Sequence, residues 1–103
     1  MTNNWADIFL KNTLLPETVD EAVELLITVL EDRHKMFLSI LQEDDLIDLH
    51  FGLGLSIRNA FRLHEVYSKL HSDCGLDNPD DASCVIIKAL WNTLKFDDWE
   101  KEN

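Results

Sequence analysis

Apolar residues recur at intervals of three and four along almost the whole chain, and this periodicity is the feature that most restricts the fold. No segment alternates apolar and polar residues for long enough to indicate a strand, and only three glycines and two prolines interrupt the pattern. The sequence therefore predicts an all-α protein, a compact single-domain bundle of about five helices. The helix expected over residues 79–95 is apolar around much of its circumference, which predicts a central place in the bundle.

The length of 103 residues favours one domain, because two halves would each be too small to bury a useful core. Within a single helical domain spanning 1–103, three parts differ in composition. Residues 1–15 form an amphipathic segment, residues 16–95 hold the main helical pattern, and residues 96–103 form an acidic tail with aromatic side chains. We expect the aromatic residues at both ends to fold back over the bundle or to anchor a partner.

Local signals predict where the helices begin and end. Thr18 and Glu21 form a capping box, in which the threonine hydroxyl accepts from the Glu21 amide and the Glu21 carboxylate returns to the cap amide. Asn78 and Pro79 suit the start of the last helix. A short helix within 32–42 is expected to turn four apolar side chains inward: Met36, Phe37, Ile40 and Leu41.

A longer helical pattern begins near Glu43 and continues to Leu70, nearly unbroken through Gly52 and Gly54. Each glycine inside a helix costs about 1 kcal/mol relative to alanine. We therefore expect these two to allow the close approach of another backbone or to mark a kink. A phosphate-binding loop is not indicated, because a third glycine, a following lysine and a preceding strand are all missing.

Several short motifs resemble those of a known family when they are taken in order. They are HFGLG at 50–54, IRN at 57–59, PDDAS at 79–83 and ALW at 89–91. Together they resemble a small bacterial domain family of unknown function, over roughly residues 16–95. The resemblance implies a compact helical domain and no particular activity. The family pattern has a histidine just before the proline, where this chain has Asn78, so a site built on that histidine is absent or altered here.

One cluster of polar side chains from these motifs is a candidate site: His50, Arg58, Asn59, Asp80, Asp81 and Ser83. In a structural interpretation, Arg58 pairs with a carboxylate at the start of the last helix and fixes how two helices meet. In a functional interpretation, the cluster is a polar pocket with His50 as general base and Arg58 as an anion clamp. We favour the first, because acidic residues at a helix start are already explained by the helix dipole.

The four histidines do not form a recognisable metal site. They are His34, His50, His64 and His71, and neither an HExxH motif nor another convergent set occurs. His50 and His64 fall on apolar stripes, where a hydrogen-bonded core histidine is expected. The sequence therefore predicts no metal and no cofactor.

The two cysteines indicate a reduced compartment. Cys74 and Cys84 form no CxxC motif, so we expect free thiols in a cytoplasmic protein. Cys84 lies on an apolar helix face and is expected to be a small buried hydrophobic residue. No catalytic residue is assigned.

The charge of the chain excludes further classes of function. Twenty acidic residues against nine Lys and Arg give a net charge of −11, which argues against direct nucleic-acid binding and against an anionic membrane surface. Residues 17–31 carry no basic residue, and they contain an acidic face that comprises Glu17, Asp20, Glu21, Glu24 and Glu31. A surface of one sign is expected to dock a basic partner.

These features predict a non-enzymatic acidic protein-interaction module of the immunity, antitoxin or adaptor type, which acts in the bacterial cytoplasm on a basic protein partner. The first residues lack the pattern of a signal peptide, and no apolar stretch is long enough to span a membrane. A homodimer is compatible with the aromatic residues at the chain ends. The alternative is a small hydrolase or ligand-binding protein with a pocket built from His50, Arg58, Asn59, Asp80 and Asp81.

Overall fold

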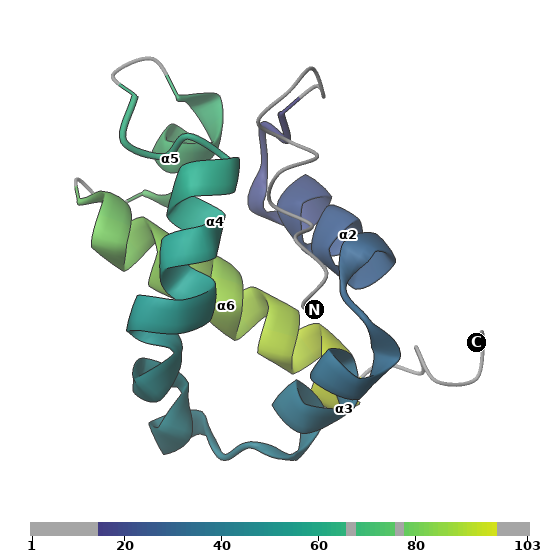
Figure 1. Ribbon diagram of the computed structural model, residues 1–103. Helices are drawn as coiled ribbons and strands as arrows, with labels where there is room; N and C mark the ends of the chain where they lie inside the picture. The colour runs from purple at the N-terminus through teal and green to yellow at the C-terminus, as the bar shows by residue number, and fades with distance from the viewer. Residues whose placement is uncertain (1–14, 66–67, 76–77, 97–103) are drawn as a thin grey trace.

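The computed structural model describes residues 15–65, 68–75 and 78–96, and within these ranges it contains helices and no strand (Figure 1). The elements are α2 (Val19–Val29), α3 (Asp32–Ile40), η1 (Glu43–Leu49), η2 (His50–Gly54), α4 (Leu55–Ala60), α5 (Lys69–Cys74) and α6 (Pro79–Phe96). The predicted all-α class is confirmed. The predicted N-terminal amphipathic segment and acidic tail lie almost entirely outside the described residues.

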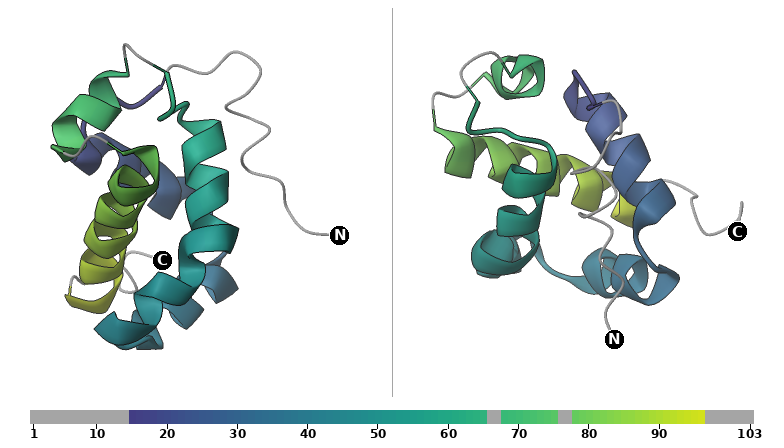
Figure 2. Two further views of the ribbon diagram at one scale, coloured as in Figure 1. Left: turned by 90° about the vertical axis from the view of Figure 1, so that its left-hand side faces the viewer. Right: turned by 45° about the horizontal axis from the view of Figure 1, so that its top comes forward.

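The longest helix, α6, is the centre of the molecule. It contacts α2, α3, α4, α5 and both η segments, and Figure 2 shows it running alongside the segment that ends in α4. Its buried side chains are Ala82, Ser83, Ile86, Ile87, Leu90, Trp91 and Leu94. They recur at three and four and form one wide stripe that packs with Leu26 of α2 and Ile57 of α4. The predicted central position of the 79–95 helix is confirmed.

The start of α2 is capped as predicted, with one difference. The Glu21 amide donates to Thr18 Oγ1 at 3.1 Å. The Glu21 carboxylate, however, accepts from the amide of Glu17 at 2.8 Å, one residue before the expected cap amide. A second cap comes from α5, where Asp73 Oδ2 accepts from the Val19 amide at 2.7 Å. This contact ties the start of α2 to α5, and no local sequence signal indicates it.

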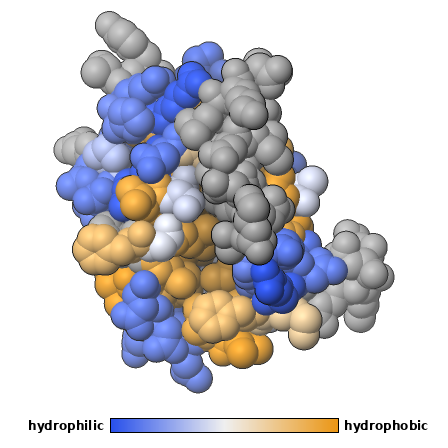
Figure 3. Space-filling view, in the orientation of Figure 1, coloured by the Kyte–Doolittle hydropathy of each residue, from blue (hydrophilic) through white to orange (hydrophobic). Residues whose placement is uncertain are grey.

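The predicted inward face of α3 is wrong for three of its four residues; the fourth, Leu41, is half-buried against the core. Met36, Phe37 and Ile40 are exposed, whereas Lys35 and Leu38 are buried. Lys35 Nζ donates to the carbonyl of Ile27 at 3.0 Å, so it satisfies a backbone acceptor near the end of α2. This bond and the packing of Leu38 fix the rotation of a nine-residue helix that lies against α6. The apolar residues left outside contribute to the apolar surface over α3 and the η1-to-α4 segment (Figure 3).

The predicted helix from Glu43 to Leu70 is interrupted after Ala60. Its first part changes from a 3₁₀ helix (η1) to a π-helix (η2) and then to an α-helix (α4). A turn follows, in which Arg62 has a positive φ of 54° and Phe61 and Leu63 are both buried. Two residues that are two positions apart cannot both face inward on one helix, so the turn allows both to enter the core. His64 is exposed, so its predicted role as a core histidine is wrong.

Candidate functional site

Arg58 joins α4 to the start of α6. Its Nε lies 3.1 Å from Asp80 Oδ1, and its Nη1 donates to Ser83 Oγ at 3.0 Å. The Ser83 hydroxyl in turn donates to the backbone carbonyl of Asp80 at 2.8 Å. The Arg58 side chain is only 11% exposed and that of Asp80 is 53% exposed. The guanidinium is therefore held inside the bundle, while the carboxylate reaches solvent.

Gly54 makes room for this guanidinium. A Cβ placed on Gly54 would lie 3.2 Å from Arg58 Nη1 and 3.5 Å from Ser83 Oγ. The backbone φ of Gly54 is −59°, an ordinary helical value, so the glycine supplies space and not conformational freedom. At Gly52, by contrast, a Cβ would meet no atom within 4 Å. The close approach expected at the two glycines therefore occurs at Gly54, and it involves a side chain.

Two other members of the predicted cluster, Asn59 and Asp81, do not converge on Arg58. Asn59 and Asp81 are exposed, and their side chains form no hydrogen bond or ion pair within the part of the chain that the structure describes. The backbone of His50 begins η2, and its side chain lies outside the described part. Arg58, Asp80 and Ser83 thus form a junction between two helices, and none of them lines either cavity described below.

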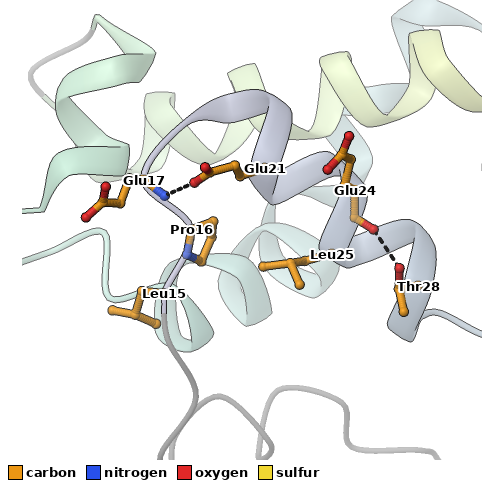
Figure 4. Close-up of a pocket in the computed structure, with 7 residues that line it drawn as sticks. All are labelled: Leu15, Pro16, Glu17, Glu21, Glu24, Leu25 and Thr28. Carbon is orange, nitrogen blue, oxygen red and sulfur yellow. Dashed lines mark hydrogen bonds between the residues drawn. The ribbon is translucent and has the colours of Figure 1, made fainter.

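An open groove of about 600 Å³ lies beside α2. It is lined by Leu15, Pro16, Glu17, Glu21, Glu24, Leu25 and Thr28. Figure 4 shows the three carboxylates above the side chains of Leu15 and Leu25. Three members of the predicted acidic face therefore border an apolar floor. Asp20 is exposed and Glu31 is half-buried, and neither lines the groove.

The carboxylates of the acidic face differ in what they contact. Glu17 pairs with Lys69 of α5 at 3.2 Å, and both side chains are exposed, so a ligand can replace this weak pair at little cost. The Glu24 carboxylate has no partner among the described residues. Glu31 pairs with Arg33 at 3.2 Å. The groove side of α2 is therefore open to a cation, as is the exposed Asp20 outside the groove.

The floor of the groove was not predicted from the sequence. Leu25 is not among the fully buried residues of α2; it packs only partly against the core, and it follows Glu24 directly in the chain. A leucine that directly follows Glu24 and lies four residues after Glu21 is the signal that could have indicated this floor. Leu15 and Pro16 reach the groove only because the chain turns before Thr18.

Comparison with known proteins places the described region in one family. A family model described as "Domain of unknown function (DUF6794)" matches residues 15–94. The chain belongs to this family. The predicted membership of a domain family of unknown function is confirmed, and the matched range nearly coincides with the range expected from the motifs. No curated protein and no solved structure matches the chain.

The two cysteines of the DUF6794 domain are free thiols. Burial, with a smaller contribution from the negative charge of Asp73, raises the pKa of Cys74 to about 11. Burial also raises the pKa of Cys84; Asp81 and Asp80 add to this shift, whereas Arg58 opposes it. Both thiols are therefore protonated near neutral pH, which is unfavourable for a nucleophile.

We expect Cys74 to react with iodoacetamide slowly near neutral pH, and faster as the pH rises toward about 11. Only the thiolate reacts, so raising the pKa from 9.0 to about 11 lowers the rate well below that pKa by roughly 100-fold. A Cys84→Ser variant isolates the reaction, which is followed by mass spectrometry while circular dichroism monitors folding. The urea-unfolded variant is the control. A rate that levels off at pH 9.0 in the folded protein would contradict the shift.

The described part of the DUF6794 domain shows neither a metal-binding cluster nor a membrane-spanning helix. Within residues 15–65, 68–75 and 78–96, no three His, Cys, Asp or Glu side chains are arranged to hold a metal ion. Among the helices in these ranges, none has both the length and the apolar character needed to cross a membrane.

Proposed function

We propose that the chain is an acidic protein-interaction module whose groove beside α2 docks a basic segment of a partner protein. The observation that carries this proposal is the convergence of Glu17, Glu21 and Glu24 on an open groove with an apolar floor. Carboxylates favour the ammonium and guanidinium groups of Lys and Arg, and the floor suits the aliphatic part of those side chains.

The electrostatics of the whole chain support this proposal. A net charge of −11 on 103 residues produces a negative potential that attracts basic partners and raises their rate of association. The Lys69–Glu17 pair on the rim is already an example of a lysine held by this groove. A partner lysine that replaced it would form the same kind of contact.

The proposed setting is a reduced, cytoplasmic one in a bacterium, where the partner is another protein. The free thiols of Cys74 and Cys84 support the reduced compartment. An immunity, antitoxin or adaptor role fits a small acidic module that acts by occupying a basic surface. In each of these roles, binding itself is the function.

Selection from a library of short displayed peptides tests the groove. We expect the full chain to enrich peptides that combine Lys or Arg with aliphatic residues. Their binding should weaken by about tenfold in a Glu21→Gln, Glu24→Gln double variant, since two charge-assisted contacts are lost. Glutamine at position 21 keeps an acceptor for the Glu17 amide, so the start of α2 is preserved. Binding should also weaken as salt is raised.

The matched control removes the same number of charges elsewhere. Glu65 and Asp81 are exposed and do not line the groove, so a Glu65→Gln, Asp81→Asn variant has the same net charge as the groove variant. We expect it to bind within about twofold of the original chain. Enriched peptides without net positive charge, or equal losses in the two variants, would contradict the proposal.

A further inference from the structure

Three large apolar side chains are exposed in a row along the segment from η1 to α4. Ile47, Phe51 and Leu55 are 66%, 82% and 47% exposed. They are four residues apart in the sequence: Leu55 follows Phe51 by about one helical turn, and Ile47 precedes Phe51 across the change from η1 to η2. We name these three residues the η1–α4 stripe. The inward side of the same segment already has its own apolar residues, Leu46, Leu49, Leu53 and Ile57.

The π-helical turn lies at the middle of this stripe. η2 spans His50–Gly54, and Phe51 within it is the most exposed of the large apolar residues that the structure describes. Short π-helical turns occur often at functional sites, because they shift side chains relative to a regular helix. An exposed aromatic side chain on a rigid helix is also a typical anchor for a partner. Figure 3 shows that apolar surface extends over this segment and α3.

A shallow cavity continues the stripe at its η1 end. It has a volume of about 200 Å³ and is lined by Glu43, Leu46, Ile47, Cys84, Ile87 and Lys88. Ile47 belongs to both the stripe and the cavity wall. The Lys88–Glu43 ion pair, at 2.6 Å, crosses from α6 to η1 at this cavity. An apolar side chain of a partner that lies along the stripe has a place to insert here.

The edge of the stripe is acidic. Asp44 and Asp48 are exposed, lie three residues before Ile47 and Phe51, and have no partner among the described residues. In a 3₁₀ helix, residues three apart are directly above one another, so the Asp44 carboxylate is next to Ile47. Asp48 lies at the end of η1, directly before the turn that carries Phe51. No Lys or Arg occurs between Glu43 and Leu55. The charge complement of this surface is therefore basic.

We infer that the η1–α4 stripe is a second docking surface, which binds an amphipathic helix of a partner protein whose apolar face is flanked by Lys or Arg. Helices bind such surfaces with apolar anchors spaced three or four residues apart, which matches the spacing of Ile47, Phe51 and Leu55. A second copy of this chain is disfavoured, because its own acidic edge would meet the same acidic edge. The stripe shares no residue with the groove beside α2, so the inference does not depend on the proposed function.

The test uses a designed probe and the full chain. The probe is a helical peptide of about five turns, roughly 18 residues, with leucines on one face and lysines beside them. A matched peptide has glutamate in place of every lysine. By fluorescence anisotropy, we expect the lysine peptide to bind and the glutamate peptide to bind at least about tenfold more weakly. No binding of the lysine peptide up to about 1 mM would overturn the inference.

Substitutions in the chain show which surface binds the peptide. Phe51→Ala should weaken binding by about tenfold or more, and its exposure makes loss of folding unexpected. Asp44→Asn with Asp48→Asn should weaken binding and reduce its salt dependence. Phe96→Ala removes an exposed phenylalanine from α6 and should change binding by less than about twofold.

Two further measurements test whether the peptide binds at the η1–α4 stripe and whether another molecule occupies that stripe instead. The Glu21→Gln, Glu24→Gln variant should bind the peptide as the original chain does, and an equal loss there would place the peptide in the groove beside α2 and overturn the inference. A photoreactive benzoylphenylalanine at position 51 should cross-link to the peptide. If it instead cross-linked to a second copy, or to residues 1–14 of the same chain, that occupant would replace the proposed partner.

Discussion

Replacing Arg58 with alanine is expected to lower the free energy of unfolding by about 2–3 kcal/mol. The change leaves the buried Ser83 hydroxyl without its donor and removes the ion pair to Asp80. Breaking a fully buried ion pair costs more than this, but Asp80 is half-exposed, so water replaces part of the lost interaction. Urea unfolding followed by circular dichroism measures the loss.

Two control variants test whether the loss of stability in Arg58→Ala comes from the contacts of its guanidinium. Asn59→Ala changes the exposed neighbour of Arg58 and should alter stability by less than about 0.5 kcal/mol. Arg58→Met keeps most of the buried aliphatic stem and should recover part of the loss. If Arg58→Ala were as stable as the original chain, the junction between α4 and α6 would not depend on this side chain. The interpretation of Arg58 as part of a ligand pocket would then regain support.

Replacing Trp91 with alanine is expected to cost about 3–4 kcal/mol, the largest effect that we predict for a single change. The indole is buried on α6, and its Nε1 donates to the Leu41 carbonyl at 2.9 Å. Lys95 Nζ lies 5.3 Å from the centre of the indole ring. The substitution therefore opens a cavity and also leaves the backbone acceptor after α3 with fewer donors.

A Trp91→Phe variant separates the contribution of packing from that of the hydrogen bond to Leu41. Trp91→Phe keeps most of the packing and loses the hydrogen bond to Leu41, so a cost of about 1 kcal/mol is expected. Thermal unfolding of the three proteins should give the order original, phenylalanine, alanine. Equal stability of the alanine and phenylalanine variants would show that the hydrogen bond, and not the packing, fixes the chain after α3 against α6.

The local signals of the sequence were reliable because they depend on few residues. The hydroxyl of Thr18 and the side chain of Asn78 cap helices that begin where predicted. The wide apolar stripe of the last helix also predicted its central position. Each of these features depends on hydrogen bonds at the start of one helix or on the spacing of apolar residues along one helix.

The errors concern residues whose neighbours are distant in the sequence. On α3, the apolar residues Met36, Phe37 and Ile40 predicted an inward face, yet the contact of Lys35 with Ile27 rotates that face outward. After Ala60, the burial of both Phe61 and Leu63 against the core ends a helix that periodicity alone would continue. Periodicity shows that a helix has an apolar face, but it does not show which neighbour covers that face.

For the candidate site, too, the sequence predicted some features and missed others. The sequence predicted that Arg58 and a carboxylate at the start of α6 would pair, because such a pair forms a strong charge-assisted bond. Ser83, which the sequence placed in the same cluster, also contacts the guanidinium, whereas Asn59 and Asp81 of that cluster remain outside. The acidic face could be read from residues 17–31, whereas its apolar floor of Leu15, Pro16 and Leu25 could not.

By itself, the sequence determined the helical class, the caps, the central helix and the excess of negative charge, because these depend on spacing along the chain and on composition. Only the tertiary structure decided which apolar residues are buried and which carboxylates border a groove. Burial and proximity depend on how separate helices rotate and cross. That arrangement is set by contacts such as those of Arg58 with Ser83 and of Trp91 with Leu41, which join residues 25 and 50 positions apart.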